Sequence, residues 1–130
     1  MPRNFFRSIL LTLSCTAAGM SPSWLLAQTA YAITGGTQLV HFNVATPGTL
    51  SSPIPISGLQ LGEIILGIDF RPASGHLFAL GSTSRIYTVS TTTGIVSQIG
   101  ASGAFALSGA AFGFDFNPTV DRIRVVSDTD

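Results

Sequence analysis

Lysine is absent from this sequence of 130 residues, and charged residues of every kind make up only 9% of it. After Ile33 the chain has four arginines and six acidic residues, which gives a net charge of 4 − 6 = −2. Proteins that bind nucleic acid need a basic surface for the phosphate backbone. The composition therefore excludes nucleic acid as a partner.

Cysteine is nearly absent as well, since Cys15 is the only one. The chain after it can form neither a disulfide nor a thiolate metal site. Thr12 stands three residues before Cys15, where a lipoprotein signal carries a leucine. We therefore interpret Cys15 as an ordinary apolar residue rather than as a lipid attachment site.

No apolar run reaches the roughly 20 residues that a membrane-spanning helix needs, because polar residues and Pro22 interrupt the first one. Residues 1–32 instead resemble a signal peptide, with two arginines, an apolar stretch and the cleavage motif Ala30-Tyr31-Ala32. Leu25-Leu26-Ala27 is a second cleavage motif, and its use would preserve a strand that we expect around Tyr31. The predicted product is a mature domain of residues 33–130 without a transmembrane segment, exported to the periplasm, the envelope or the outside.

The rest of the chain consists of short apolar runs that end at glycine, proline or serine, and this pattern is typical of β-strands separated by tight turns. Pro55 places its strand at a sheet edge or a bulge. One weak helix candidate is present at Leu59–Ile65. The nine predicted strands cover residues 31–33, 39–43, 54–57, 66–70, 77–80, 86–89, 96–99, 112–116 and 123–126.

A motif recurs along the chain. Gly67, Asp69, Phe70 and Pro72 return 46 positions later as Gly113, Asp115, Phe116 and Pro118. An internal repeat of this length indicates an array of small supersecondary units. Aligning the earlier strands as well divides the nine into groups of three, four and two.

Four short strands per 46 residues is the size of one β-propeller blade, so we expect an all-β fold of antiparallel four-stranded repeats. Nine strands make about two blades, whereas propellers close with about four or more. Three explanations remain open: further chain is missing, several copies assemble, or the sheets form a small open stack. We favour missing chain.

Three segments together resemble the bacterial family of unknown function DUF4394. They are residues 31–36, 66–72 and 113–127, and the resemblance extends over essentially the whole of residues 31–130. It implies an exported, all-β, propeller-like protein without an established activity. Members of the family continue past the last motif with further repeats.

Asp69 and Asp115 are the candidate site residues, because carboxylates repeated in register could hold Ca²⁺ or act as acid and base. The alternative is that each accepts backbone N–H bonds and fixes the turn before Pro72 or Pro118. We favour the structural role, because a residue present in every unit is explained by how the unit is built. A second group, Asp121, Asp128 and Asp130, lacks EF-hand spacing and is interpreted as turn caps.

Arg122 and Arg124 alternate with apolar residues and so project from one face of a strand. They could clamp an anionic ligand, but pairing with Asp115, Asp121 or Asp128 is the simpler prediction. His41 and His76 have no second metal ligand at a suitable spacing, and no cofactor is predicted.

The sequence therefore favours a non-enzymatic binding or structural module. A secreted hydrolase or metal-binding enzyme that uses the repeated aspartates is the alternative, and a truncated, non-functional remnant is the third hypothesis. If the chain is complete, self-association would have to complete the ring.

Overall fold

A computed structural model describes residues 28–129, which form nine β-strands and no helix. The strands are β1 (Thr29–Thr34), β2 (Gln38–Asn43), β3 (Ile54–Pro55), β4 (Ile65–Phe70), β5 (Leu77–Gly81), β6 (Arg85–Val89), β7 (Val96–Ile99), β8 (Phe112–Asn117) and β9 (Arg122–Ser127). No stretch of this part of the chain is a helix long and apolar enough to cross a membrane.

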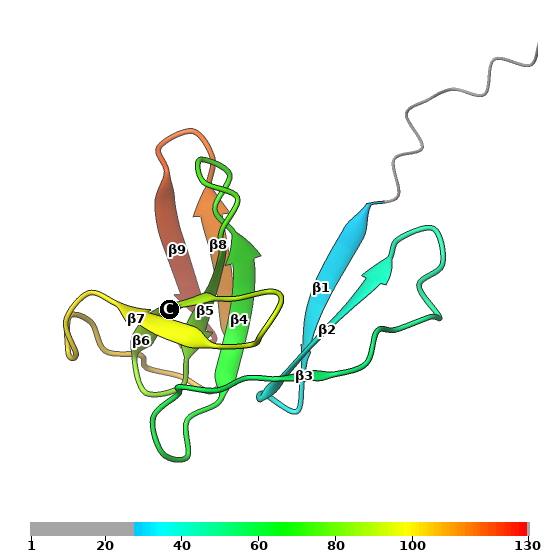
Figure 1. Cartoon of the computed structure of the whole chain (residues 1–130). Coiled ribbons are helices and arrows are strands. Elements are labelled where there is room, and N and C mark those ends of the chain that lie inside the picture. Colours follow the sequence, from blue (N-terminus) through cyan, green and yellow to red (C-terminus); the bar gives the residue numbers. More distant parts are fainter. Residues whose placement is uncertain (1–27, 130) are drawn as a thin grey trace, which may run out of the picture.

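The strands form three separate antiparallel sheets, in the orders β1-β2-β3, β4-β5-β6-β7 and β8-β9 (Figure 1). The expected all-β class and the grouping into three, four and two strands are confirmed. Each sheet follows chain order, and none of them closes on itself. Pro55 lies in β3 at the edge of the first sheet, where the missing N–H of proline costs no ladder bond.

The helix candidate at Leu59–Ile65 is wrong. The chain turns at Leu61 and Gly62 and then enters β4 at Ile65. Gly62 has a φ of +74°, a conformation that an α-helix does not contain. The apolar residues of this segment do not form one helical face, since Ile65 is buried in the core while Leu61 is fully exposed to solvent.

The main core lies between the first and second sheets. Its buried members come from β2, β4, β5, β6 and β7: Leu39, Ile65, Leu77, Ala79, Tyr87, Val89 and Val96. All five residues of β5 are buried, because this strand has a sheet packed against each of its faces. An apolar run such as Leu77–Gly81 is what a strand covered on both faces requires.

The sheets meet through their first strands. β4 lies beside β8, and β1 contacts β4 on the other side (Figure 1). The β1–β4 contact includes an edge-to-face pair of aromatic rings, Tyr31 with Phe70 at 5.4 Å between centroids. The second and third sheets share a similar pair, Phe78 of β5 with Phe116 of β8 at 5.0 Å. Such pairs add about 0.5–1.5 kcal/mol to the burial of the rings themselves.

Candidate functional site

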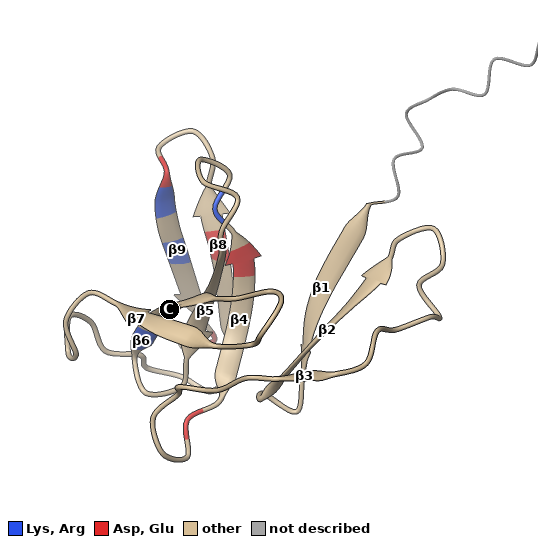
Figure 2. Ribbon diagram, in the orientation of Figure 1, with Lys and Arg blue, Asp and Glu red and all other residues tan. Residues whose placement is uncertain are grey.

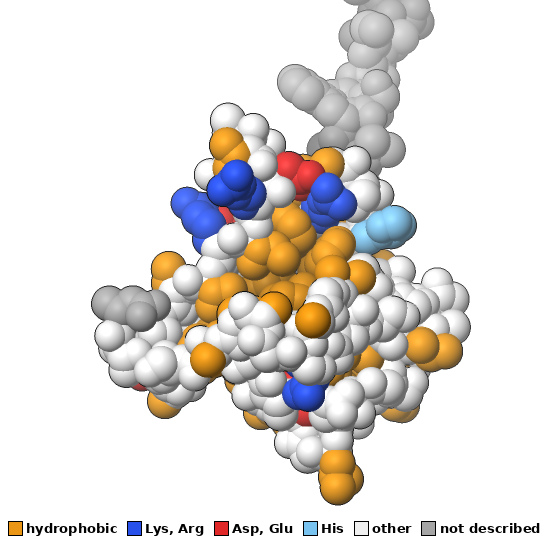
Figure 3. All heavy atoms as spheres, turned by 90° about the vertical axis from the view of Figure 1, so that its left-hand side faces the viewer, with side chains coloured by type: hydrophobic (Ala, Val, Ile, Leu, Met, Phe, Trp, Pro, Cys, Tyr) orange, Lys and Arg blue, Asp and Glu red, His pale blue; other side chains and the backbone are white. Residues whose placement is uncertain are grey.

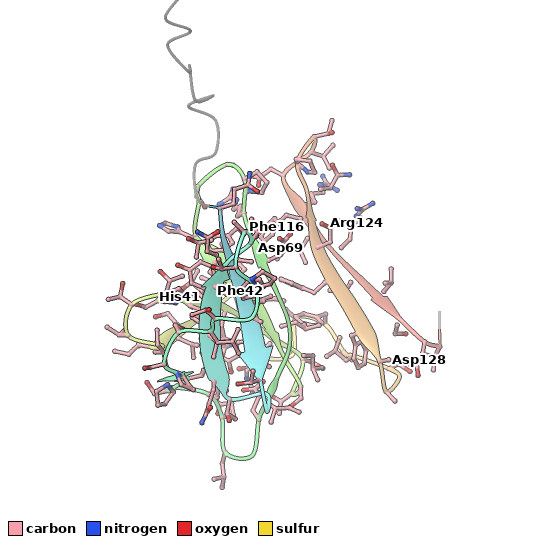
Figure 4. The ribbon with its side chains drawn as sticks, turned by 90° about the vertical axis from the view of Figure 1, so that its right-hand side faces the viewer. His41, Phe42, Asp69, Phe116, Arg124 and Asp128 are labelled. Carbon is pink, nitrogen blue, oxygen red and sulfur yellow. The ribbon has the colours of Figure 1, made fainter. Side chains whose placement is uncertain are left out.

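Asp69, near the end of β4, joins two sheets. Its Oδ1 accepts the backbone N–H of Phe70 at 2.9 Å, and its Oδ2 accepts the backbone N–H of Phe116 on β8 at 2.8 Å. Figure 4 shows Asp69 and Phe116 next to each other between the sheets. Both carboxylate oxygens are thus used by main-chain donors, and the bond from Phe116 holds β8 in place on β4.

Asp115 occupies the matching position of β8 but has a different partner. It forms an ion pair with Arg124 of β9, directly opposite in the β8–β9 register, and Arg124 Nε lies 3.2 Å from Asp115 Oδ2. The two side chains are 51% and 63% exposed, so this pair is a surface ion pair of small energetic value. The structure therefore gives the two repeated aspartates different surroundings.

Arg71 and Asp121 form a second ion pair between the loop after β4 and the turn before β9. Arg71 Nε donates to Asp121 Oδ1 at 2.8 Å, and a second contact makes the pair bidentate. The hydrogen bond from Arg71 holds the pKa of Asp121 below its ordinary value. Asp121 therefore pairs with Arg71 and not with its neighbour Arg122.

Most of the charged groups in residues 28–129 lie at one end of the molecule, where β4 ends and β9 begins (Figure 2). A hollow of about 410 Å³ opens there over an apolar floor of Phe78, Phe116 and Ile123. Arg71, Asp121 and Arg122 line its polar rim. A space-filling view shows a hydrophobic patch with basic side chains along its border on the face that carries β8 and β9 (Figure 3).

Arg122 differs from the other two arginines at this end. It is exposed, and it takes part in neither of the two ion pairs formed within residues 28–129. Its guanidinium group is therefore the one at the hollow that remains available for an anion.

The second aspartate group does not assemble. Asp128 accepts the backbone N–H of Ala110 at 2.8 Å, and this bond lowers the pKa of Asp128. Asp121 is paired with Arg71, and Asp130 lies outside the described residues. Across residues 28–129, no three side chains of His, Cys, Asp or Glu are grouped so that they could hold a metal ion.

The remaining motif residues shape the backbone. Gly67 lies so close to β8 that a Cβ atom added to it would come within 2.8 Å of Phe114 Cβ. Gly113 meets only the Val126 side chain in its own sheet. Pro72 and Pro118 follow β4 and β8 and begin the turns, where a missing N–H is tolerated.

Glu63 is a buried carboxylate that the sequence analysis did not single out. It is 3% exposed, and its oxygens accept the Tyr87 hydroxyl at 2.6 Å and the backbone N–H groups of Gln60 and Thr83 at 3.1 and 3.2 Å. Burial raises its pKa, but the bonds from Thr83, Tyr87 and Gln60 outweigh that effect and hold the pKa below the ordinary 4.5. A single acid in the apolar run before the first repeated motif is the sequence signal that could have found it.

Comparison with known proteins agrees with the resemblance seen in the sequence. No curated protein and no solved structure matches the chain. A family model described as a domain of unknown function, DUF4394, matches residues 38–130, which is well over half of the chain. The chain therefore belongs to the DUF4394 family.

Proposed function

We propose that this protein is an exported, non-enzymatic module in which propeller-like β-sheets stack in sequence and present a binding surface at one end. The observation that carries the proposal is the use of Asp69. Both of its oxygens accept backbone N–H groups, one from β4 and one from β8. A carboxylate whose two oxygens both accept main-chain N–H groups holds the sheets together, and this use favours a structural role over a catalytic or metal-binding one.

The stacking is supported by the positions of the first strands. β4 contacts β8 on one side and β1 on the other, and an edge-to-face aromatic pair joins each two neighbouring sheets, Tyr31 with Phe70 and Phe78 of β5 with Phe116. Consecutive four-stranded units in a propeller approach one another through their inner strands, as β4 and β8 do.

The hollow beside Arg122 is the part of residues 28–129 best suited to a ligand. Its apolar floor and its unpaired guanidinium group fit a molecule that combines an anionic group with an apolar portion. We therefore assign to this surface a ligand of that class.

The test compares Asp69→Ala with Asp115→Ala in the full chain. Asp69→Ala leaves the Phe116 N–H without its acceptor, which costs about 1–3 kcal/mol, or a fall of about 5–15 °C in melting temperature. Asp115→Ala removes only a surface ion pair and should change the melting temperature by less than about 2 °C.

The opposite pattern would contradict the proposal. If Asp69→Asn keeps the melting temperature but abolishes calcium binding or hydrolysis of a glycan or lactone, the protein is an enzyme or a metal-binding protein. For the surface, Arg122→Gln should weaken binding of an anionic, partly apolar dye such as anilinonaphthalene sulfonate, while Arg124→Gln serves as the matched control. Equal dye binding by both variants would contradict the assignment of a ligand to the hollow.

A further inference from the structure

The register of the strands repeats from sheet to sheet. In the first sheet Ala30 pairs with Phe42, and in the second sheet Leu77 pairs with Val89, which is the same pair shifted by 47 residues. β1 and β2 therefore correspond to β5 and β6. β5, however, has β4 on its other edge, whereas β1 has no strand there among the described residues.

The last sheet follows the same rule. Asp69 pairs with Phe78 in β4–β5, and Asp115 pairs with Arg124 in β8–β9, which is a shift of 46. β8 and β9 thus correspond to β4 and β5. Within residues 28–129, the first sheet is therefore the one that lacks a strand of the β4 kind.

A groove lies where that strand would be. A hollow of about 150 Å³ runs between β1 and β4 and is lined by Thr29, Ala30, Tyr31, Ile68, Asp69, Phe70 and Leu77. Shifting these positions by 46 or 47 residues gives His76 and residues of β5, β8 and β9, and of these strands β5 and β8 contact β4. The lining is therefore the counterpart of the surface against which β4 packs.

We propose that this groove binds an extended strand with the pattern Gly-x-Asp-Phe-x-Pro, which adds to the free edge of β1 in the antiparallel direction. The occupant is a partner strand from outside residues 1–130. Residues 1–27 contain no aspartate, and β4 and β8, which carry the pattern, are already paired to β5 and β9.

The register of the guest strand follows from the β4–β5 pairs. Its aspartate lies opposite Tyr31 and its phenylalanine lies opposite Ala30, as Asp69 and Phe70 lie opposite Phe78 and Leu77. The guest carboxylate shares the Phe70 N–H, which also donates to Asp69 Oδ1 at 2.9 Å, in the position where Asp69 accepts the Phe116 N–H at 2.8 Å. The guest glycine lies against Ile68, where a side chain would collide, as it would at Gly67 against Phe114.

The inference can be tested with a fluorescein-labelled peptide of residues 65–72, titrated into the full chain and followed by anisotropy. We expect saturable binding. Changing the peptide aspartate to alanine, or its glycine to valine, should each raise Kd at least tenfold. Hydrogen exchange at the amides of β1 should slow when the wild-type peptide is added.

The register is tested by disulfide trapping in a Cys15→Ser background. A peptide with cysteine in place of its phenylalanine should cross-link to Ala30→Cys and not to Val126→Cys, which is 61% exposed on β9. Equal binding of the three peptides, cross-linking at β9, or a stable dimer that blocks the peptide would each overturn the proposal. The melting temperatures of the Asp69 variants do not enter this test, so its failure is distinct from failure of the proposed function.

Discussion

Asp69 accepts the backbone N–H of Phe116 at 2.8 Å, across 47 residues of sequence and between two sheets that share no strand pairing. The bond fixes the position of β8 along the axis of β4. Gly67, two residues before Asp69, lets β8 approach because it has no Cβ atom. One hydrogen bond and one missing side chain therefore define how two successive sheets stack.

Gly67→Ala should destabilise the protein by about 1–3 kcal/mol, because the new Cβ would lie 2.8 Å from Phe114 Cβ and force β4 and β8 apart. The measurement is urea unfolding monitored by circular dichroism. Gly113→Ala is the matched control. It meets only the tip of the Val126 side chain, which is 61% exposed and can move, so its free energy of unfolding should change by less than about 0.5 kcal/mol. Equal losses in the two variants would contradict the close β4–β8 contact.

Glu63→Ala should cost about 3 kcal/mol, because it leaves the Tyr87 hydroxyl and the N–H groups of Gln60 and Thr83 without their acceptor in a buried place. Tyr87→Phe removes one donor and leaves the carboxylate bonded to the others, so it should cost about 1 kcal/mol. Both values come from chemical unfolding at pH 7. A loss of unfolding free energy in Tyr87→Phe as large as that in Glu63→Ala would show that the tyrosine hydroxyl accounts for the whole effect and that the two backbone N–H bonds of the carboxylate contribute nothing.

Stability should fall at acid pH. The folded state holds the pKa of Glu63 below 4.5, so the contribution of the carboxylate is present in full above pH 4.5 and is lost as the pH falls through the folded-state value. Unfolding free energies measured between pH 7 and pH 3 should therefore decrease, and Glu63→Gln should show a shallower decrease than the wild type. An unchanged slope in Glu63→Gln would assign the acid sensitivity to other carboxylates, such as Asp121 and Asp128.

Tyr87 should ionise at a higher pH than an ordinary tyrosine. Burial, together with the hydrogen bond to Glu63 and its charge, raises the pKa of Tyr87 from 10.0 to about 12. The folded state thus favours the neutral phenol, and that contribution is present below pH 10 and lost as the pH rises towards 12. An ultraviolet titration of phenolate should show a late phase that disappears in Tyr87→Phe. A late phase that persists in Tyr87→Phe would contradict this prediction.

On the proposal that the protein is exported, its mature N-terminus should be Gln28. β1 begins at Thr29, and its Tyr31 and Ile33 pack against the core, so cleavage after Ala32 would remove four of the six residues of the strand. Cleavage after Ala27, which lies outside the described residues, keeps β1 whole. Mass spectrometry of the protein recovered from an expressing bacterium distinguishes the two products. A mature chain that begins at Ile33 would contradict this prediction.

The strand positions were predictable because each signal is local. Alternating apolar residues and turn-forming glycines and prolines mark a strand wherever it packs, so all nine strands were located to within about two residues at their ends. The repeated motif also indicated which strands belong together. Local patterns failed at Leu59–Ile65, because some apolar residues of this segment are buried and others are exposed, and they do not form one helical face.

Local sequence patterns could not predict the partners of the individual charged side chains. Asp69 and Asp115 have the same sequence surroundings, yet one accepts an N–H group from the next sheet and the other pairs with Arg124. The simpler prediction for the arginines holds for Arg124, while Arg122 remains outside both ion pairs. Glu63 was missed because its partners Thr83 and Tyr87 are 20 and 24 residues away.

Local sequence signals were sufficient to predict the all-β class, the nine strands of residues 28–129, their division into three, four and two, and membership in the DUF4394 family. Each of these depends on residue periodicity and turn chemistry, which act over a few neighbouring positions. Packing between distant segments determines which carboxylate links two sheets, which acid is buried and which strand edge has no neighbour within residues 28–129. Those outcomes depend on what packs against each side chain from distant parts of the chain, and a one-dimensional pattern contains no such distances.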